Sequence, residues 1–138
     1  MKRLSLTFLL AAAAAVAAEE PDDAAKGVFR SVESGWKAND QDAVSDHFDE
    51  KVSLSFGPKP GSYGKDQGAT YLKKYFADNP TSTLKIKKDG YSGGDNPSAR
   101  YDYTYTNASG VKVTASLIVS LGKNKDGDWV IRSITVAG

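Results

Sequence analysis

The segment Ser62–Phe76, SYGKDQGATYLKKYF, contains the residue types of a phosphate-binding loop, because a glycine-flanked turn delivers Lys65 to the start of a helix. The complete pattern G-x-x-x-x-G-K-[ST] is absent, since Lys59 stands five residues before Gly64 and Asp66 follows Lys65. Asp66 would also repel a phosphate. The segment therefore predicts a helix start and not a nucleotide site, although free N–H groups near Lys59 and Lys65 could hold a carboxylate or a simple anion.

The same segment has the composition of a capped helix N-terminus. Gly64 suits the N-cap position, Asp66 complements the helix dipole, and Gln67 stands where its amide can reach back to the N–H group of the cap. Tyr63 and Lys65 flank this cap. We take both as candidate ligand-binding residues at the rim of a pocket.

His47 is the only histidine of the chain, and Asp46, Asp49 and Glu50 adjoin it. Neighbouring helical positions point in different directions, so these side chains do not converge on one ion, and we expect no metal site. The imidazole suits either packing at the edge of an apolar helix face or general base catalysis. Asp46 and Asp102 are the carboxylates that join His47 as catalytic candidates, and no nucleophile motif accompanies them.

A tyrosine stripe runs through Tyr101, Tyr103 and Tyr105, which alternate with polar residues as in a half-buried strand. A phenol offers apolar area together with one orienting hydroxyl, so the stripe suits the lining of a pocket. The other interpretation is that these rings fill the core. We take the three tyrosines and Trp36 as candidate ligand-binding residues.

The N-terminal segment has the features of a secretory signal peptide. Lys2 and Arg3 precede the largely apolar run 4–18, and small residues end this run at Ala18. We expect cleavage near Ala18, export to the periplasm or the extracellular space, a single domain over residues 19–138 and no stable membrane insertion after cleavage.

Composition excludes some partners. Without Lys2 and Arg3, the 18 basic residues of the chain become 16 against 17 acidic ones, a formal charge of −1. This near-neutral balance, with no basic block, argues against nucleic acid as a partner. The chain has no cysteine, so an exported domain of this sequence has to be held together by its core.

Periodicity predicts helices over 21–39 and 40–48, a strand over 52–56 and a helix that begins after Gly64 and stops at Asn79-Pro80. Alternating strands then follow, separated by turn sequences typical of antiparallel hairpins. In the last strand the alternation shifts, which indicates a bulge near Arg132-Ser133. The order of elements predicts an α+β fold, with the N-terminal helices packed on the concave face of a curved antiparallel sheet.

This order resembles the nuclear transport factor two-like (SnoaL-like, cystatin-like) cone fold, and more closely a family of exported bacterial proteins that is known as a domain of unknown function. The residues that carry the resemblance are Phe48 with 52–54, 61–67, 72–76, Asn79-Pro80 and 129–131. The chain departs from that family at Gly64 and Gly68. The resemblance implies a cone fold and an exported location but brings no agreed activity.

The wider superfamily contains enzymes with an aspartate or histidine inside the cone and also non-catalytic pockets. In this chain the first strand offers only Ser53 and Ser55 between its apolar residues, so the usual position of the base is empty. We therefore expect a binding module for a small apolar or anionic ligand or for a protein, without a cofactor. The alternatives are an isomerase, dehydratase or hydrolase that uses His47 or a pocket carboxylate, and a structural module that forms a homodimer through the sheet.

Overall fold

The chain forms three helices and six strands over the residues that the structure, a computed structural model, describes: 20–57 and 60–138. The helices are α2 (Asp23–Lys37), α3 (Gln41–Ser45) and α4 (Lys65–Asp78). The strands are β1 (Phe48–Ser55), β2 (Gly61–Gly64), β3 (Thr81–Ser92), β4 (Ser98–Thr106), β5 (Lys112–Lys123) and β6 (Trp129–Ala137). The predicted signal peptide, residues 1–18, lies outside the described residues. Within those residues, no helix is long and apolar enough to cross a membrane.

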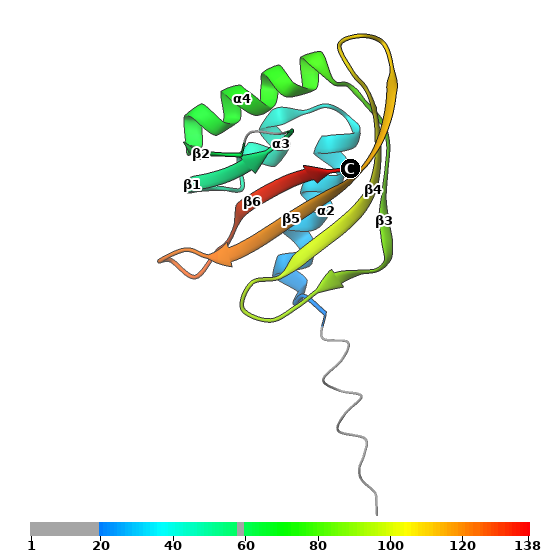
Figure 1. Cartoon of the computed structure of the whole chain (residues 1–138). Coiled ribbons are helices and arrows are strands. Elements are labelled where there is room, and N and C mark those ends of the chain that lie inside the picture. Colours follow the sequence, from blue (N-terminus) through cyan, green and yellow to red (C-terminus); the bar gives the residue numbers. More distant parts are fainter. Residues whose placement is uncertain (1–19, 58–59) are drawn as a thin grey trace, which may run out of the picture.

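All six strands belong to one curved sheet in the order β2-β1-β6-β5-β4-β3 (Figure 1). The hairpins β3–β4, β4–β5 and β5–β6 are antiparallel, as the turn sequences predict. The first strand, β1, pairs in parallel with the last strand, β6, and this pairing was not predicted. It brings the first long strand of the chain and the last one side by side inside the sheet.

The predicted bulge in β6 is confirmed. Ser120 of β5 pairs with Ser133, but the next pair is Leu121 with Ile131, so Arg132 has no partner on β5. An extra residue in one strand reverses the alternation of its side chains. Ile131 and Ile134 are therefore both fully buried although they stand three residues apart.

One row of the sheet consists of serines in all six strands. The register pairs each serine with the next across the β2–β1, β1–β6, β6–β5, β5–β4 and β4–β3 contacts. The row contains Ser62, Ser53, Ser133, Ser120, Ser98 and Ser92. Ser53, Ser98 and Ser120 each stand between two buried residues, so the row belongs to the face that the helices leave open.

The two N-terminal helices begin at acidic caps. The carboxylate of Asp22 accepts a hydrogen bond from the N–H of Ala25 at 2.8 Å and starts α2. The prediction that the next helix extends to Phe48 is wrong. The N–H of Ile131 donates to the His47 carbonyl at 2.7 Å, and Phe48 pairs with Ile131, so β6 draws this part of the chain into the sheet.

Helix α4 begins at Lys65 with Gly64 as its N-cap, as predicted. Among the described residues the Gln67 side chain makes no hydrogen bond, so the expected contact with the cap is not formed. The short strand β2 before this helix was missed, because Gly-Ser-Tyr-Gly shows no apolar alternation. A Cβ on Gly61 would lie 2.7 Å from the Tyr63 hydroxyl, so glycine is needed for the Tyr63 ring to cover the strand.

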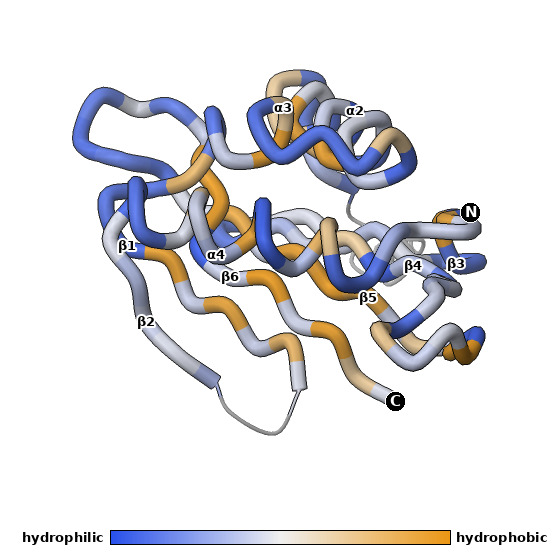
Figure 2. Tube along the Cα trace, turned by 90° about the horizontal axis from the view of Figure 1, so that it is seen from above, coloured by the Kyte–Doolittle hydropathy of each residue, from blue (hydrophilic) through white to orange (hydrophobic). Residues whose placement is uncertain are grey.

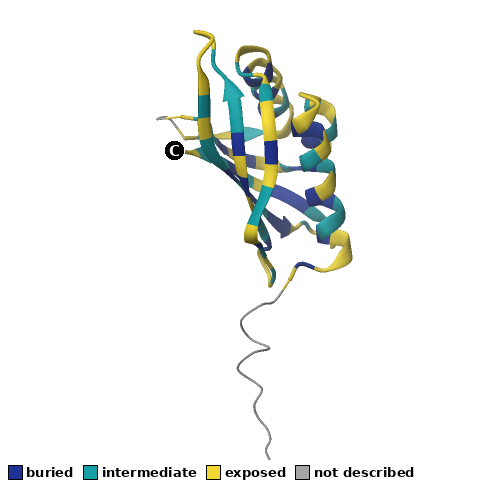
Figure 3. Ribbon diagram, turned by 90° about the vertical axis from the view of Figure 1, so that its right-hand side faces the viewer, coloured by how far each residue is buried: buried dark blue, intermediate teal, exposed yellow. Residues whose placement is uncertain are grey.

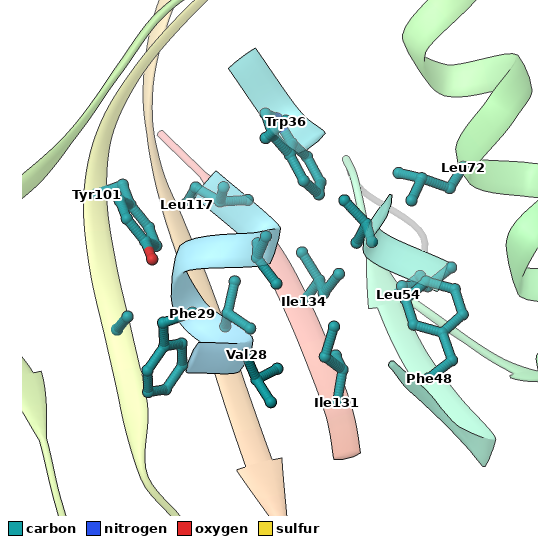
Figure 4. Packing of buried hydrophobic residues seen from close by; sticks show 14 of the residues in the cluster. Val28, Phe29, Trp36, Phe48, Leu54, Leu72, Tyr101, Leu117, Ile131 and Ile134 are labelled. Atoms are coloured by element: carbon teal, nitrogen blue, oxygen red, sulfur yellow. The ribbon is translucent and has the colours of Figure 1, made fainter. Parts of the chain in front are cut away.

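The core lies between the helices and the sheet, as expected for this α+β class. The helices cover one face of the sheet and leave the other face open (Figure 3). Hydrophobic residues recur along β1, β6 and β5 (Figure 2), and the buried ones belong to the core cluster. Trp36 of α2 packs among Leu54, Leu72 and Ile134, and Tyr101 points from β4 toward α2 (Figure 4).

Candidate functional site

The predicted tyrosine stripe lies on the inner face of β4, and most of it is buried. Tyr101, Tyr103 and Trp36 have no exposed surface, so the structure places all three in the packed core. A ligand cannot touch them unless the core opens. Tyr105 is half-buried at the end of the stripe, where its ring packs on Tyr103 with centroids 5.0 Å apart.

The cone interior contains one hydroxyl pair. The Tyr75 hydroxyl of α4 and the Tyr103 hydroxyl of β4 form a buried hydrogen bond of 3.0 Å. Burial raises the pKa of Tyr75, and Tyr103 adds to this shift. Burial also raises the pKa of Tyr103, while the hydrogen bond from Tyr75 acts in the opposite direction. Both phenols are therefore neutral hydrogen-bonding groups at physiological pH.

Three other buried polar groups have no hydrogen-bond partner within the described chain: Trp36 Nε1, Thr81 Oγ1 and the Tyr101 hydroxyl. Burial raises the pKa of Tyr101, and the nearby Tyr91 and Glu33 add to this shift, so this phenol is also neutral. An unpartnered polar group in a core costs free energy. These groups therefore lower the free energy of unfolding of the core.

A hollow of about 450 Å³ opens at the edge of the interior, where β1 and β6 end and β5 begins. We call it the mouth hollow. Its lining includes Phe56, Tyr105, Val113, Ala115, Thr135 and Val136. The Phe56 ring lies 4.5 Å from the Tyr75 ring, so the wall of the hollow rests directly on the buried tyrosine pair. None of the lining side chains in the part of the chain that the structure describes carries a charge.

The catalytic candidates do not reach the mouth hollow. His47 and Asp46 line a separate cleft of about 580 Å³ at the opposite end of the sheet, together with Lys65 and Arg132. We call it the polar cleft. Asp102 lies on the open face of the sheet, where its carboxylate binds the Lys87 ammonium. The enzyme alternative requires His47 or a carboxylate in the pocket, and among the described residues neither lines the mouth hollow.

His47 is half-buried in the polar cleft. Burial lowers the pKa of His47, Asp46 opposes this shift, and Lys65 adds to it. The imidazole is therefore neutral at pH 7. The described residues contain no group of three or more histidine, cysteine, aspartate or glutamate side chains that could hold a metal ion.

Tyr63 lies at a third place, in a shallow groove between β2 and α4. Its ring stacks on Tyr71 at 5.0 Å, and Tyr71 stacks on Phe56 at 5.5 Å. The six predicted ligand-binding residues are thus distributed over the core, the mouth hollow, the polar cleft and this groove. They do not form one site.

Three residues of these sites were missed by sequence reasoning. Phe56 stands at the end of an alternating strand, and Tyr75 forms part of an aromatic ridge with Tyr71, so both looked like packing residues. Arg132 falls at the predicted bulge, and this shift in alternation was the signal that could have identified it.

A curved six-stranded sheet with helices on its concave face and a hollow at the mouth defines a protein of the nuclear transport factor two-like class. The chain belongs to the DUF4783 family, a domain of unknown function, whose family profile matches residues 29–137. The resemblance found in the sequence is confirmed. The comparison with curated proteins finds no match.

Solved structures show the same fold at low sequence identity. A DUF4783 family protein from Bacteroides uniformis is similar with a TM-score of 0.68 and 13% identity, over 78% of this chain and 94% of that one. A ketosteroid isomerase-like protein from Erwinia carotovora atroseptica is similar with a TM-score of 0.63 and 20% identity, over 82% and 92%. An NTF-2 like protein of unknown function from Shewanella oneidensis has a TM-score of 0.54 and 17% identity, over 84% and 98%. At these identities the likeness concerns the fold alone.

Proposed function

We propose that the protein is an exported, non-catalytic binding domain that takes a small apolar ligand in the mouth hollow. The observation that supports this is the lining: aromatic and aliphatic side chains surround a hollow of about 450 Å³, and none of them is charged. Ligand pockets are mostly apolar with a few polar groups that orient the ligand. Here the Tyr105 and Thr135 hydroxyls provide those groups. Export rests on the signal-peptide features of residues 1–18.

We infer binding without catalysis because the described lining of the hollow contains no acidic or basic side chain for proton transfer. General acid–base chemistry needs a titratable side chain within hydrogen-bond reach of the substrate. The phenol of Tyr105 is the only titratable side chain that lines the hollow among the described residues. A ligand in this place is held by contact area and oriented by hydroxyls, and no histidine, aspartate or glutamate side chain of the described residues lines the hollow to abstract a proton.

The proposal is tested by native mass spectrometry of protein purified from its own exported compartment. We expect a co-purified small molecule on the wild-type chain and its loss in Val113→Trp, because the indole would fill the hollow. Val111→Trp is the matched control, since Val111 stands two residues earlier in the chain and its side chain is exposed. An empty wild-type protein, or equal occupancy in the two variants, contradicts the proposal.

A second candidate function, homodimerisation through the open face of the sheet, is favoured by the serine row. Serine side chains lose little conformational entropy on burial and both donate and accept hydrogen bonds. Two copies of a face with such a row can approach closely and pair their hydroxyls. We infer this assembly as a second function, and it can coexist with the ligand site because no residue of the serine row lines the mouth hollow.

A further inference from the structure

The polar cleft lies at the end of the sheet opposite the mouth hollow, and the two share no lining residue. Its walls come from four segments: the start of β1 with the residues before it, the first residue of α4, the β5–β6 turn with the strand ends beside it, and the bulge of β6. The fold thus gathers side chains from distant parts of the sequence around one space of about 580 Å³.

Arg132 is held in place within this cleft. Its Nε lies 3.0 Å from Oδ2 of Asp49, and its Nη2 donates to the Lys123 carbonyl at 2.6 Å. A Cβ on Gly122 would come within 2.7 Å of the guanidinium carbon, so the glycine leaves room for this side chain. Nη1 has no partner among the described residues. Its two N–H groups remain available to a carboxylate.

His47 and Lys65 add a neutral imidazole and an ammonium group. Lys65 Nζ reaches the carbonyl of Asp46 at 3.4 Å and forms no ion pair within the described chain. Both side chains line the cleft, and the carbonyl that Lys65 contacts belongs to the residue directly before His47. A carboxylate bound between Lys65 and Arg132 would therefore also be near the imidazole.

The cleft carries free charges of both signs. Four basic and five acidic residues line it, and the Arg132–Asp49 contact is the one ion pair between lining residues in the described part of the chain. Lys123 lies over the Trp129 ring, 4.9 Å from its centroid. A purely anionic ligand would meet more acids than bases. A ligand that carries both charges matches the lining.

We propose that the polar cleft binds a small zwitterion, a free amino acid, with its carboxylate at Lys65 and Arg132 and its ammonium group toward the acids of the cleft, Glu50, Asp126 and Asp128. This site is independent of the apolar site proposed above. Without its ammonium group the ligand's carboxylate would be repelled by the acids of the cleft, and without its carboxylate the ammonium group would be repelled by the bases. Both charges are therefore required for tight binding.

Three small probes test this inference by NMR at pH 7 and matched ionic strength. Glycine has both charges, N-acetylglycine has only the carboxylate, and glycinamide has only the ammonium group. His47 is the sole histidine, so one imidazole signal reports on the site. We expect glycine to shift this signal saturably and to raise the pKa of His47, because a carboxylate arrives beside the ring. The blocked probes should bind at least about tenfold more weakly.

Two variants test which side chains bind the carboxylate of the ligand. Lys65→Gln and Arg132→Gln should each weaken glycine binding about tenfold. Lys65→Gln disturbs no ion pair of the described chain, so it stays informative if Arg132→Gln alters the fold. The matched controls Lys73→Gln on α4 and Arg100→Gln on β4 are exposed residues outside the cleft and should leave binding unchanged. The absence of a saturable shift, equal binding of a blocked probe, or an equal loss in the controls overturns the inference.

Discussion

The hydroxyl groups inside the cone have different surroundings, although the tyrosines that carry them alternate along one strand. Tyr103 shares a hydrogen bond of 3.0 Å with Tyr75, whereas the Tyr101 hydroxyl has no partner among the described residues. Both side chains are fully buried. The sequence pattern alone cannot distinguish them, because the difference arises from where α4 places Tyr75.

A single pair of substitutions measures this difference. Tyr103→Phe leaves the Tyr75 hydroxyl buried without a partner and should lower the free energy of unfolding by about 1–3 kcal/mol. Tyr101→Phe removes a hydroxyl that has no partner and should leave the free energy of unfolding unchanged or raise it. Urea denaturation of both variants provides the measurement. Equal destabilisation would mean that the hydrogen bond contributes nothing.

The elements were predicted well where a strong period or a turn sequence defines them. Helix α2 follows from the helical spacing of its apolar residues, and strands β4, β5 and β6 follow from the alternation of apolar and polar side chains. The bulge in β6 follows from the point at which this alternation shifts. Two elements show the limit of this reasoning. Strand β2 is too short to show a period, and the end of α3 is decided by pairing with β6, more than eighty residues further along the chain.

Replacement by alanine is expected to have opposite effects on stability at two glycines, one in a strand and one in a helix. Gly90 is buried where the β3–β4 register shifts, and a Cβ there would lie 2.6 Å from the Arg100 carbonyl oxygen and 2.8 Å from that of Lys87. Backbone cannot yield as a flexible side chain can, so Gly90→Ala should cost about 1–3 kcal/mol.

Gly27→Ala in α2 is the matched control. Apart from its chain neighbours and the backbone of its own helix, no atom lies within 4 Å of the position of its Cβ, and alanine favours the helix by about 0.5–1 kcal/mol relative to glycine. Thermal unfolding should therefore show a lower midpoint for Gly90→Ala and a higher one for Gly27→Ala. A stable Gly90→Ala protein would show that the bulge of β3 adjusts easily.

At the scale of the whole molecule, the sequence predicts the fold class and the family but not the sites. The tyrosine stripe was correctly assigned to the inner face of a strand, yet whether such a stripe lines a pocket or fills a core depends on the volume between sheet and helices. Trp36 and Leu72 take up that volume, and the remaining space lies at the mouth. The polar cleft likewise could not be predicted, because the bulge and the parallel β1–β6 pair bring Arg132 next to Asp49.

The serine row on the open face of the sheet can be tested as a homodimer interface. Ser120 lies within the serine row, between Ser133 and Ser98, so Ser120→Arg would place a long charged side chain where two faces meet. If the protein dimerises through this face, sedimentation velocity should give a dimer for the wild type and a monomer for Ser120→Arg, because a buried unpaired guanidinium opposes association. Ser109→Arg, in the exposed β4–β5 turn, should remain dimeric. A monomeric wild type, or a dimeric Ser120→Arg variant with an intact fold, would show that the serine row faces only solvent.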